Sequence, residues 1–412
     1  MDPTRRGFSN NGSGTIRDVF QRTYTFQEAR LARATGSYPF FMPISESDAT
    51  EVVVDGRRFI MLGSNNYLGL THHPEVVEAA RRAIDRYGTS CTGSRLLNGT
   101  LDLHVELEAR LARFVGKEAA LVFSTGYQSN LAVLSCLVGR GDVVLRDREN
   151  HASIVDGCAL SFGQTLAYRH NAMNDLERIL MKLSPGQGRL VVTDGVFSME
   201  GDIVDLPRLV AVASAQGARV MIDDAHALGV LGPGGRGTAA HFGLTDRVDL
   251  IMASFSKSLA SVGGFVAGEA QVLEYVRHRA RPFIFSASIP ASAAAAALKA
   301  LEVLEAEPGR VSALWRNAIY MREQLAALGY VIGATQSPIV PIVTGDVTTT
   351  FRLWRALFDE GIFVNAAIPP AVSGRRCLLR TSYMATHQKE HLDRALEAFQ
   401  RVRRKEGAPP LS

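Results

Sequence analysis

A single lysine, Lys257, stands in a stretch of small and apolar residues, IMASFSKSLASVGGFVAG, which runs from Ile251 to Gly268. The apolar residues before it predict a buried strand. An amine kept among apolar residues and glycines can have a lowered pKa, which suits it to bond an aldehyde carbon. The flanking Ser254 and Ser256 can add hydroxyl donors. Taken alone, the lysine could also reach solvent from the edge of a core.

Other polar residues follow predicted strands elsewhere in the chain. Asp223 and His226 lie in VMIDDAHALG, His151 lies in DRENHASIVDG, and Gly126 lies in STGYQSN at a strand-to-helix turn. In open α/β sheets, ligands bind beyond the carboxyl ends of the strands. Each residue also has a structural explanation: a helix N-cap for Asp223, a core histidine for His226, a helix start for His151 and a turn for Gly126.

Together these residues suit one aromatic, anionic cofactor, pyridoxal 5'-phosphate (PLP). Its chemistry requires a lysine for the Schiff base and an aspartate to pair with the pyridinium nitrogen, the roles predicted for Lys257 and Asp223. The phosphate requires anion-binding backbone groups. Gly126 and Tyr127, at the start of a predicted helix, offer N–H groups and the positive end of the helix dipole.

The elements that must position these residues predict an α/β fold. The runs AALVFS, DVVLRD, RLVVTDG, ARVMIDDA and VDLIMAS predict buried strands of a mostly parallel sheet, and helical patterns such as QSNLAVLSCLVGR and DLPRLVAVASAQGA separate them. This alternation indicates a doubly wound sheet with helices on both faces. EVVVDGRRFIMLGS predicts a hairpin, and TFQEARLARA predicts a helix.

Three regions are expected. Residues 1–60 would form an arm, a helix and the hairpin; residues 61–291 would form the large cofactor-binding domain. Residues 292–412 would form a smaller α+β domain, which begins with the alanine-rich helix ASAAAAALKALEVLEAEPG and includes the strands SPIVPIVTG and CLLRTSY. The length of 412 residues suits two domains that share an interface.

Composition excludes several classes of protein. The net charge is +4, and no Lys/Arg run is dense enough to predict nucleic-acid binding. There is no apolar stretch of membrane-spanning length, no secretory signal and no metal-binding cysteine pattern. The four cysteines lie far apart and suit reduced thiols, which predicts a cytoplasmic protein. Arg5, Arg6 and Arg17 could touch anionic lipid, although a disordered terminus explains them as well.

The motifs resemble those of the α-oxoamine synthases, fold-type I PLP enzymes that join an amino acid to an acyl thioester with loss of CO2. The resemblance covers nearly the whole chain and rests on SNNYLGLTHHPEV, GTSCTGSRLLNGTLDLHVELE, FSTGYQSNL, NHASIVDG, TDGVFSMEGDIVDLP, DDAHALGVLGPGGRGT, SFSKSLASVGGF, FSASIP and LLRTSYMATH. Within the family the chain is most similar to the bacterial serine palmitoyltransferase branch. TGSRLLNGT, Asn66 and Asp194 indicate that branch.

The resemblance implies a fold of the aspartate aminotransferase type with a seven-stranded sheet, and a role for each matching residue. Lys257 would bond PLP and later move protons, and Asp223 would pair with the ring nitrogen. His226 and Ser198 would hydrogen-bond the ring oxygen, and His151 would stack on the ring. The phosphate would be held by Gly126, Tyr127, Ser254, Ser256 and Ser286 of the neighbouring subunit, with Ser288 as the alternative to Ser286. The substrate carboxylate would meet Arg380, with Asn65 and His151 nearby.

The resemblance also implies the reaction and the partners. L-serine and a long-chain acyl-CoA, palmitoyl-CoA, would condense in a homodimer whose active site lies at the subunit interface. Alternatives within the family are 8-amino-7-oxononanoate synthase, glycine C-acetyltransferase and a condensing enzyme of secondary metabolism. A PLP aminotransferase and an inactive partner subunit are further alternatives; the HAS, DDAH and SKS motifs oppose the first, and the presence of Lys257 opposes the second.

Overall fold

The computed structural model describes residues 18–372 and 376–406. They divide into two compact units, of which the first ends at Phe41 and the second begins at Met42. Arg5, Arg6 and Arg17, the cations considered for lipid contact, lie outside the described residues. The predicted boundaries at residues 60/61 and 291/292 stay a prediction.

The first unit contains two short helices, α1 (Gln21–Tyr24) and α2 (Glu28–Ala34). The second of these is the helix that TFQEARLARA predicts. Neither helix buries a residue. The guanidinium of Arg33 lies 4.3 Å from the ring centroid of Tyr38, a contact within this unit.

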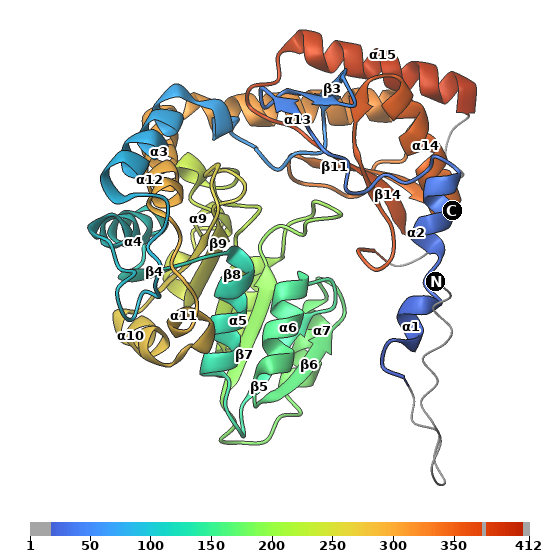
Figure 1. Cartoon of the computed structure of the whole chain (residues 1–412). Helices are drawn as coiled ribbons and strands as arrows, with labels where there is room; N and C mark the ends of the chain where they lie inside the picture. Colours follow the sequence, from blue (N-terminus) through green and yellow to red (C-terminus); the bar gives the residue numbers. More distant parts are fainter. Residues whose placement is uncertain (1–17, 373–375, 407–412) are drawn as a thin grey trace, which may run out of the picture. The chain divides into compact units, whose positions relative to one another are not determined.

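The second unit is built on a seven-stranded sheet (Figure 1) with the order β4-β10-β9-β8-β7-β5-β6. Its strands are β4 (Ala119–Phe123), β5 (Val143–Asp147), β6 (Gln164–Tyr168), β7 (Arg189–Asp194), β8 (Arg219–Asp223), β9 (Leu250–Ser254) and β10 (Gly264–Gly268). Only β10 runs antiparallel to its neighbours. The predicted mostly parallel sheet is confirmed, and the five strands predicted for it are present. Strands β6 and β10 were not predicted; GFVAG has a glycine at each end, which is typical of a loop.

Helices cover both faces of this sheet because successive strand residues point to opposite sides. In β4, Ala120 and Val122 join the core on one face, while Leu121 and Phe123 join the core on the other. The helices of this region are α3 (Pro74–Tyr87), α4 (Asp102–Val115), α5 (Gly126–Leu137), α6 (Ala152–Leu160), α7 (Met173–Leu180), α8 (Leu206–Ala215), α9 (Thr238–His241), α10 (Ala270–Arg279) and α11 (Arg281–Ile284). Helices α4, α8 and α12 pack on the first face, and α5, α6 and α10 on the second.

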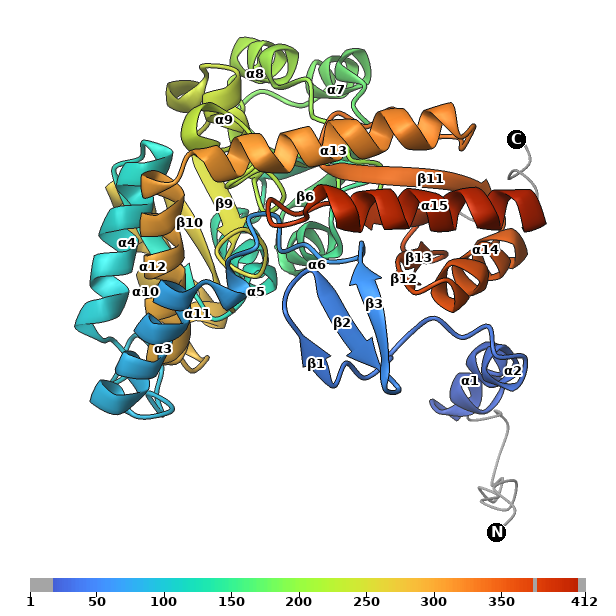
Figure 2. The same ribbon diagram turned by 90° about the horizontal axis from the view of Figure 1, so that it is seen from above.

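A second core joins the hairpin to the C-terminal part of the chain. Strand β12 (Ile362–Phe363) pairs in parallel with β3 of the sheet formed by β1 (Glu46–Ser47), β2 (Glu51–Val54) and β3 (Arg57–Met61). A three-stranded sheet contains β11 (Ile339–Gly345), β14 (Cys377–Ser382) and β13 (Asn365–Ala367). The helices here are α12 (Ala291–Ala306), α13 (Gly309–Ala327), α14 (Val347–Asp359) and α15 (Lys389–Glu406). Figure 2 shows α13 and α15 running beside β11.

None of the helices in the described ranges is long and apolar enough to span a membrane.

A buried ion pair fixes the segment that precedes α4. Both guanidinium nitrogens of Arg95 lie within 3.1 Å of the carboxylate of Glu108, and only 7% and 8% of the two side chains are exposed. Glu108 also accepts from the backbone N–H of Val122 in β4, and Arg95 donates to Thr100. The pair therefore ties this segment to the edge of the main sheet.

Replacing Arg95 by methionine should lower the free energy of unfolding by about 3 kcal/mol, since a buried carboxylate is left without its cation. Urea unfolding followed by fluorescence would measure the change. Arg82→Met is the matched control: that guanidinium is 70% exposed and 3.7 Å from Glu78, so its loss should change stability by no more than about 0.5 kcal/mol. Equal effects of both substitutions would contradict the assignment.

Candidate active site

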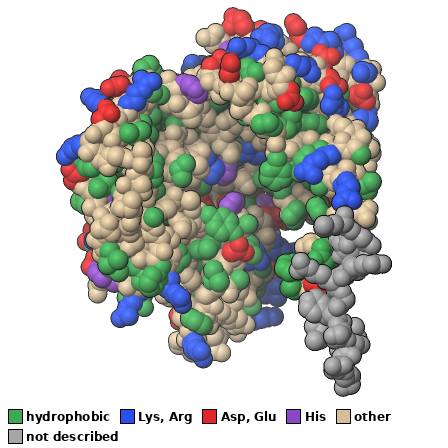
Figure 3. Space-filling view, in the orientation of Figure 1, with side chains coloured by type: hydrophobic (Ala, Val, Ile, Leu, Met, Phe, Trp, Pro, Cys, Tyr) green, Lys and Arg blue, Asp and Glu red, His purple; other side chains and the backbone are tan. Residues whose placement is uncertain are grey.

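A cavity of about 290 Å³ lies at the carboxyl ends of β8 and β9. It brings together many of the residues singled out in the sequence: Gly126, Tyr127, His151, Asp223, His226, Ser254, Ser256 and Lys257. Thr125, Ser153, Asp194, Ala225, Met252, Val262 and Gly263 complete its lining. Figure 3 shows a hollow in the surface with histidine side chains at its floor.

One end of the cavity is rich in donors. Helix α5 begins at Gly126, and its N-cap, Thr125, accepts from the N–H of Gln128. The N–H groups of Gly126 and Tyr127 have no acceptor within the described residues. A helix start with free N–H groups and no acidic residue in its first turn attracts an anion.

Glycine is required at position 126 because the helix start touches the sheet. A Cβ on Gly126 would lie 2.9 Å from the Cβ of Ser254, and one on Gly264 would lie 2.6 Å from the Cα of Gly126. This contact places the hydroxyl of Ser254 beside the helix start. The hydroxyl of Ser256 lies 2.6 Å from that of Ser254, so both serines serve the same end of the cavity.

Asp223 ends β8 in a fixed orientation. Its two carboxylate oxygens accept from the Nδ2 of Asn130 at 2.7 Å and from the N–H of Ala225 at 2.9 Å. The same amide nitrogen of Asn130 lies 2.8 Å from the hydroxyl of Ser153. Asp223 is 4% exposed, so it offers a buried carboxylate to a cationic group in the cavity.

Lys257 follows β9 and is partly buried. Burial lowers the pKa of its amine, and so does the positive charge of Arg380, whereas Asp223 and Asp194 act in the opposite direction. The net shift is downward, which increases the fraction of neutral amine. The amine is thus suited to nucleophilic attack, as the sequence predicted.

His151 lies before α6 and caps it. Its Nδ1 accepts from the N–H of Ser153 at 3.2 Å, and its own N–H donates to Asp194 at 3.0 Å. Asp194 also accepts from Asn150. Burial and the neighbouring Asp223 raise the pKa of Asp194 to about 8, so this carboxyl is largely protonated at neutral pH. It anchors the backbone of His151 without adding a full negative charge.

Arg380, on β14, reaches the same region from the three-stranded sheet. Its Nε donates to the backbone oxygen of Ser198 at 2.6 Å, and its Nη2 donates to Oδ1 of Asn65 at 2.9 Å. Its Nη2 is 3.5 Å from the hydroxyl of Tyr67, which lies 2.7 Å from Nδ1 of His226. Three predicted residues, Arg380, Ser198 and Asn65, are therefore joined to one another and, through Tyr67, to the cavity-lining His226.

The serines proposed to reach a neighbouring subunit's cofactor lie outside the cavity lining of their own chain. The hydroxyl of Ser286 accepts from Nε2 of Gln128, one turn into α5, at 3.1 Å. Ser288 instead bonds the backbone oxygen of Gly93 through its N–H and its hydroxyl. The partner role of either serine stays a prediction.

The donor set fits PLP. The helix start with Ser254 and Ser256 suits a phosphate, Asp223 suits a protonated ring nitrogen, and Lys257 supplies the amine for the aldehyde. Among the described residues there is no group of histidine, cysteine or carboxylate side chains able to hold a metal ion.

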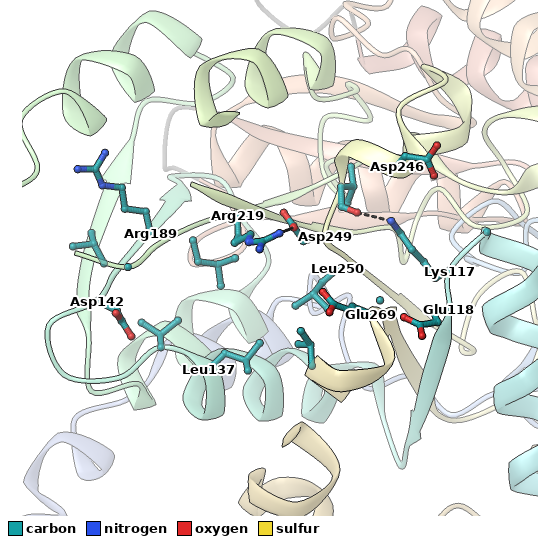
Figure 4. Close-up of a pocket in the computed structure, with 18 residues that line it drawn as sticks. Lys117, Glu118, Leu137, Asp142, Arg189, Arg219, Asp246, Asp249, Leu250 and Glu269 are labelled. Carbon is teal, nitrogen blue, oxygen red and sulfur yellow. Dashed lines mark hydrogen bonds and ion pairs between the residues drawn. The ribbon is translucent and has the colours of Figure 1, made fainter. Parts of the chain in front are cut away.

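A larger cavity, of about 600 Å³, lies at the opposite edge of the sheet (Figure 4). Lys117, Arg219 and Asp249 line it, but these groups are already paired: Lys117 donates to the carbonyl oxygens of Thr245 and Val248, and Arg219 lies 2.6 Å from Asp249. None of the residues predicted for cofactor or substrate binding lines this cavity.

Sequence reasoning missed Asn130, Tyr67 and Asp194 as members of the site. A signal existed for each of them. Asn130 lies one helical turn after Gly126, Tyr67 is two residues from Asn65, and Asp194 ends the strand RLVVTD as Asp223 ends the next one.

Comparison with known proteins identifies the class. The family model for aminotransferase class I and II matches residues 57–399. A serine palmitoyltransferase of Sphingobacterium spiritivorum is 51% identical over 382 residues, which cover 93% of this chain and 96% of that protein. A solved serine palmitoyltransferase from S. paucimobilis, with bound PLP and myriocin, superposes with a TM-score of 0.92 at 38% identity, covering 95% of this chain and 100% of that one.

The chain therefore belongs to the aminotransferase class I and II family. Within it, the predicted resemblance to the serine palmitoyltransferase branch of the α-oxoamine synthases is confirmed. Another branch is also similar: an 8-amino-7-oxononanoate synthase of Geobacter sulfurreducens is 45% identical over 378 residues, 91% of this chain and 96% of that protein.

Borohydride treatment of the protein with PLP should attach the cofactor covalently to Lys257, because only a lysine bonded to the aldehyde carbon is trapped by reduction. Peptide mass spectrometry would locate the label, and Lys257→Ala should abolish it. Lys117→Ala is the matched control, since burial also lowers the pKa of that lysine at the opposite edge of the sheet. A label on Lys117, or one that survives Lys257→Ala, would refute the assignment.

Arg380→Met should shift the reaction of Lys257 with added PLP to higher pH. The charge of Arg380 lowers the pKa of the amine, so its removal raises that pKa and leaves less neutral amine at a given pH. The rate at which the visible band appears, followed across pH, measures the shift. Arg376→Met is the control, because Arg376 is paired with Glu200 at 3.1 Å and should leave the profile in place. A downward shift in Arg380→Met would contradict the electrostatic argument.

Proposed function

We propose that this protein is a PLP-dependent acyltransferase that condenses L-serine with a long-chain acyl-CoA. The products would be 3-ketodihydrosphingosine, CoA and CO2 when the donor is palmitoyl-CoA, which is the first step of sphingolipid synthesis. The observation that carries the proposal is the placement of Lys257 beside Asp223 in one cavity, with Arg380 connected to that cavity through Tyr67 and His226. Relatives that are 46–51% identical and named serine palmitoyltransferase support it.

When bound, PLP supplies an aldehyde carbon for the amine and a pyridinium ring that takes up the electron pair left at Cα when its proton or its carboxylate departs. Asp223 holds the ring nitrogen protonated, and its two hydrogen bonds fix the direction of its charge. Lys257, with its lowered pKa, removes and returns protons at Cα.

Arg380 is the candidate for binding the substrate carboxylate. A guanidinium binds a carboxylate through charge-assisted hydrogen bonds, and Asn65 already orients this one from one side. While the carboxylate is held there, its bond to Cα can be kept out of the direction in which it breaks readily. Carbon–carbon bond formation would then precede loss of CO2, with the order enforced by geometry.

We further propose that the protein works as a homodimer in the cytoplasm, possibly touching the inner face of the membrane where its long-chain product would partition. The phosphate at the α5 start would receive an additional hydroxyl from Ser286 of the partner subunit, or from Ser288 in the alternative arrangement. Helix α5 begins in the donor-rich end of the cavity, and Ser286 already contacts α5 in its own chain.

An 8-amino-7-oxononanoate synthase activity is the second candidate, because the relative of that name is 45% identical over nearly the same length. Both reactions use the same carbon chemistry, and they differ in the amino acid and in the acyl donor.

A substrate panel decides between these functions. The purified protein with palmitoyl-CoA should release CoA with L-serine at least about tenfold faster than with glycine or L-alanine, because loss of a hydrogen bond to the serine hydroxyl costs on the order of 1 kcal/mol or more. Product mass would identify the 3-keto amino alcohol. Lys257→Ala is the inactive control.

Faster turnover of L-alanine with a pimeloyl donor would replace the leading proposal by the second candidate. Release of a 2-oxo acid from the amino acid would indicate an aminotransferase instead.

A further inference from the structure

Tyr67 is a buried tyrosine that contacts two residues of the site. It is 1% exposed, its hydroxyl lies 2.7 Å from Nδ1 of His226, and Nη2 of Arg380 lies 3.5 Å from the same oxygen. No other described side chain is within hydrogen-bonding distance of this hydroxyl. The tyrosine follows the hairpin, whereas His226 follows β8 and Arg380 lies on β14.

The direction of the Tyr67–His226 hydrogen bond follows from what each partner can do. A guanidinium only donates, so Arg380 cannot accept the hydroxyl proton of Tyr67. Burial raises the pKa of Tyr67, so the hydroxyl keeps its proton. Nδ1 of His226 is then the one acceptor within reach of that proton.

The charge around His226 supports the same direction. Burial together with Lys257, Arg380 and His151 holds the pKa of His226 well below its ordinary value, so the ring is neutral at physiological pH. A neutral imidazole has one N–H and one acceptor nitrogen. If Nδ1 accepts from Tyr67, the ring proton resides on Nε2.

We propose that Tyr67 is a positioning residue that fixes His226 as the Nε2–H tautomer, with Arg380 setting the direction of the hydrogen bond. His226 lines the cavity, and Tyr67 occupies its Nδ1, so the remaining nitrogen is the one available to a cavity ligand. The site therefore presents a neutral N–H donor at this position.

This donor deepens the proposed function, on which its use rests, because the deprotonated ring oxygen of PLP requires a donor and not an acceptor. It also connects recognition with chemistry. The guanidinium proposed to bind the carboxylate is the group that directs the tyrosine proton towards the histidine.

The test measures the tautomer itself in the full-length chain. With ¹⁵N-labelled histidine and PLP removed by a competing amine, the ¹⁵N NMR signals of His226, assigned by their absence in His226→Gln, should show a protonated Nε2 and an unprotonated Nδ1. In Tyr67→Phe the two tautomers should become mixed, because water in the cavity can both donate to and accept from Nε2. In Arg380→Met the wild-type preference should weaken.

Tyr383→Phe is the matched control. Tyr383 is fully buried, and its hydroxyl lies 3.1 Å from that of Thr381 and not against His226. This variant should keep the wild-type signals. In the holoenzyme, Tyr67→Phe should bind PLP up to roughly tenfold more weakly, as expected when a donor hydrogen bond is no longer held in place.

A protonated Nδ1 in the wild-type protein would overturn the proposal without any variant. Unchanged signals in a folded Tyr67→Phe protein would also overturn it. Because these signals are read without substrate, they are independent of the substrate panel: a failed panel with the expected tautomer would refute the proposed function and leave the role of Tyr67 intact.

Discussion

The site depends on one constraint: ionisable groups buried at the carboxyl ends of the strands must each be held by a partner. Asp223 illustrates it, because both of its oxygens accept hydrogen bonds within 2.9 Å while the side chain is 4% exposed. An unpaired carboxylate there would be costly or would take up a proton. Asn130 and the N–H of Ala225 keep it in place, and so determine where a ring nitrogen can be met.

The antiparallel strand β10 follows from the same demand for space. Lys257 leaves β9 in a turn that must return beside β4, and β10 pairs with both strands. Its first residue, Gly264, lies against Gly126, where a Cβ would meet the backbone at 2.6 Å. The helix start can therefore lie directly on the sheet, with its N–H groups beside the hydroxyls of Ser254 and Ser256.

Much of this arrangement was predictable from sequence. The parallel strands show as continuous apolar runs, and the residues that follow them, such as His151, Asp223 and Lys257, lie in the cavity as expected. Strand β10 was not predictable, since its glycines serve a contact with α5 that is distant in the chain. Tyr67 was missed for a similar reason: its partners are 159 and 313 positions away, and an aromatic residue after a hairpin most often predicts core packing.

The two halves of the proposed reaction are carried by different elements. The seven-stranded sheet supplies Lys257, Asp223 and His226, the residues for bond formation at a cofactor. The three-stranded sheet supplies Arg380, held against Ser198 and Asn65. Substitutions near Arg380 can therefore change which amino acid is bound and leave the carbon chemistry intact. Relatives of nearly equal identity to this chain accordingly carry the names of two different condensing enzymes. The hydrogen bonds through Tyr67 are what make the two parts one site.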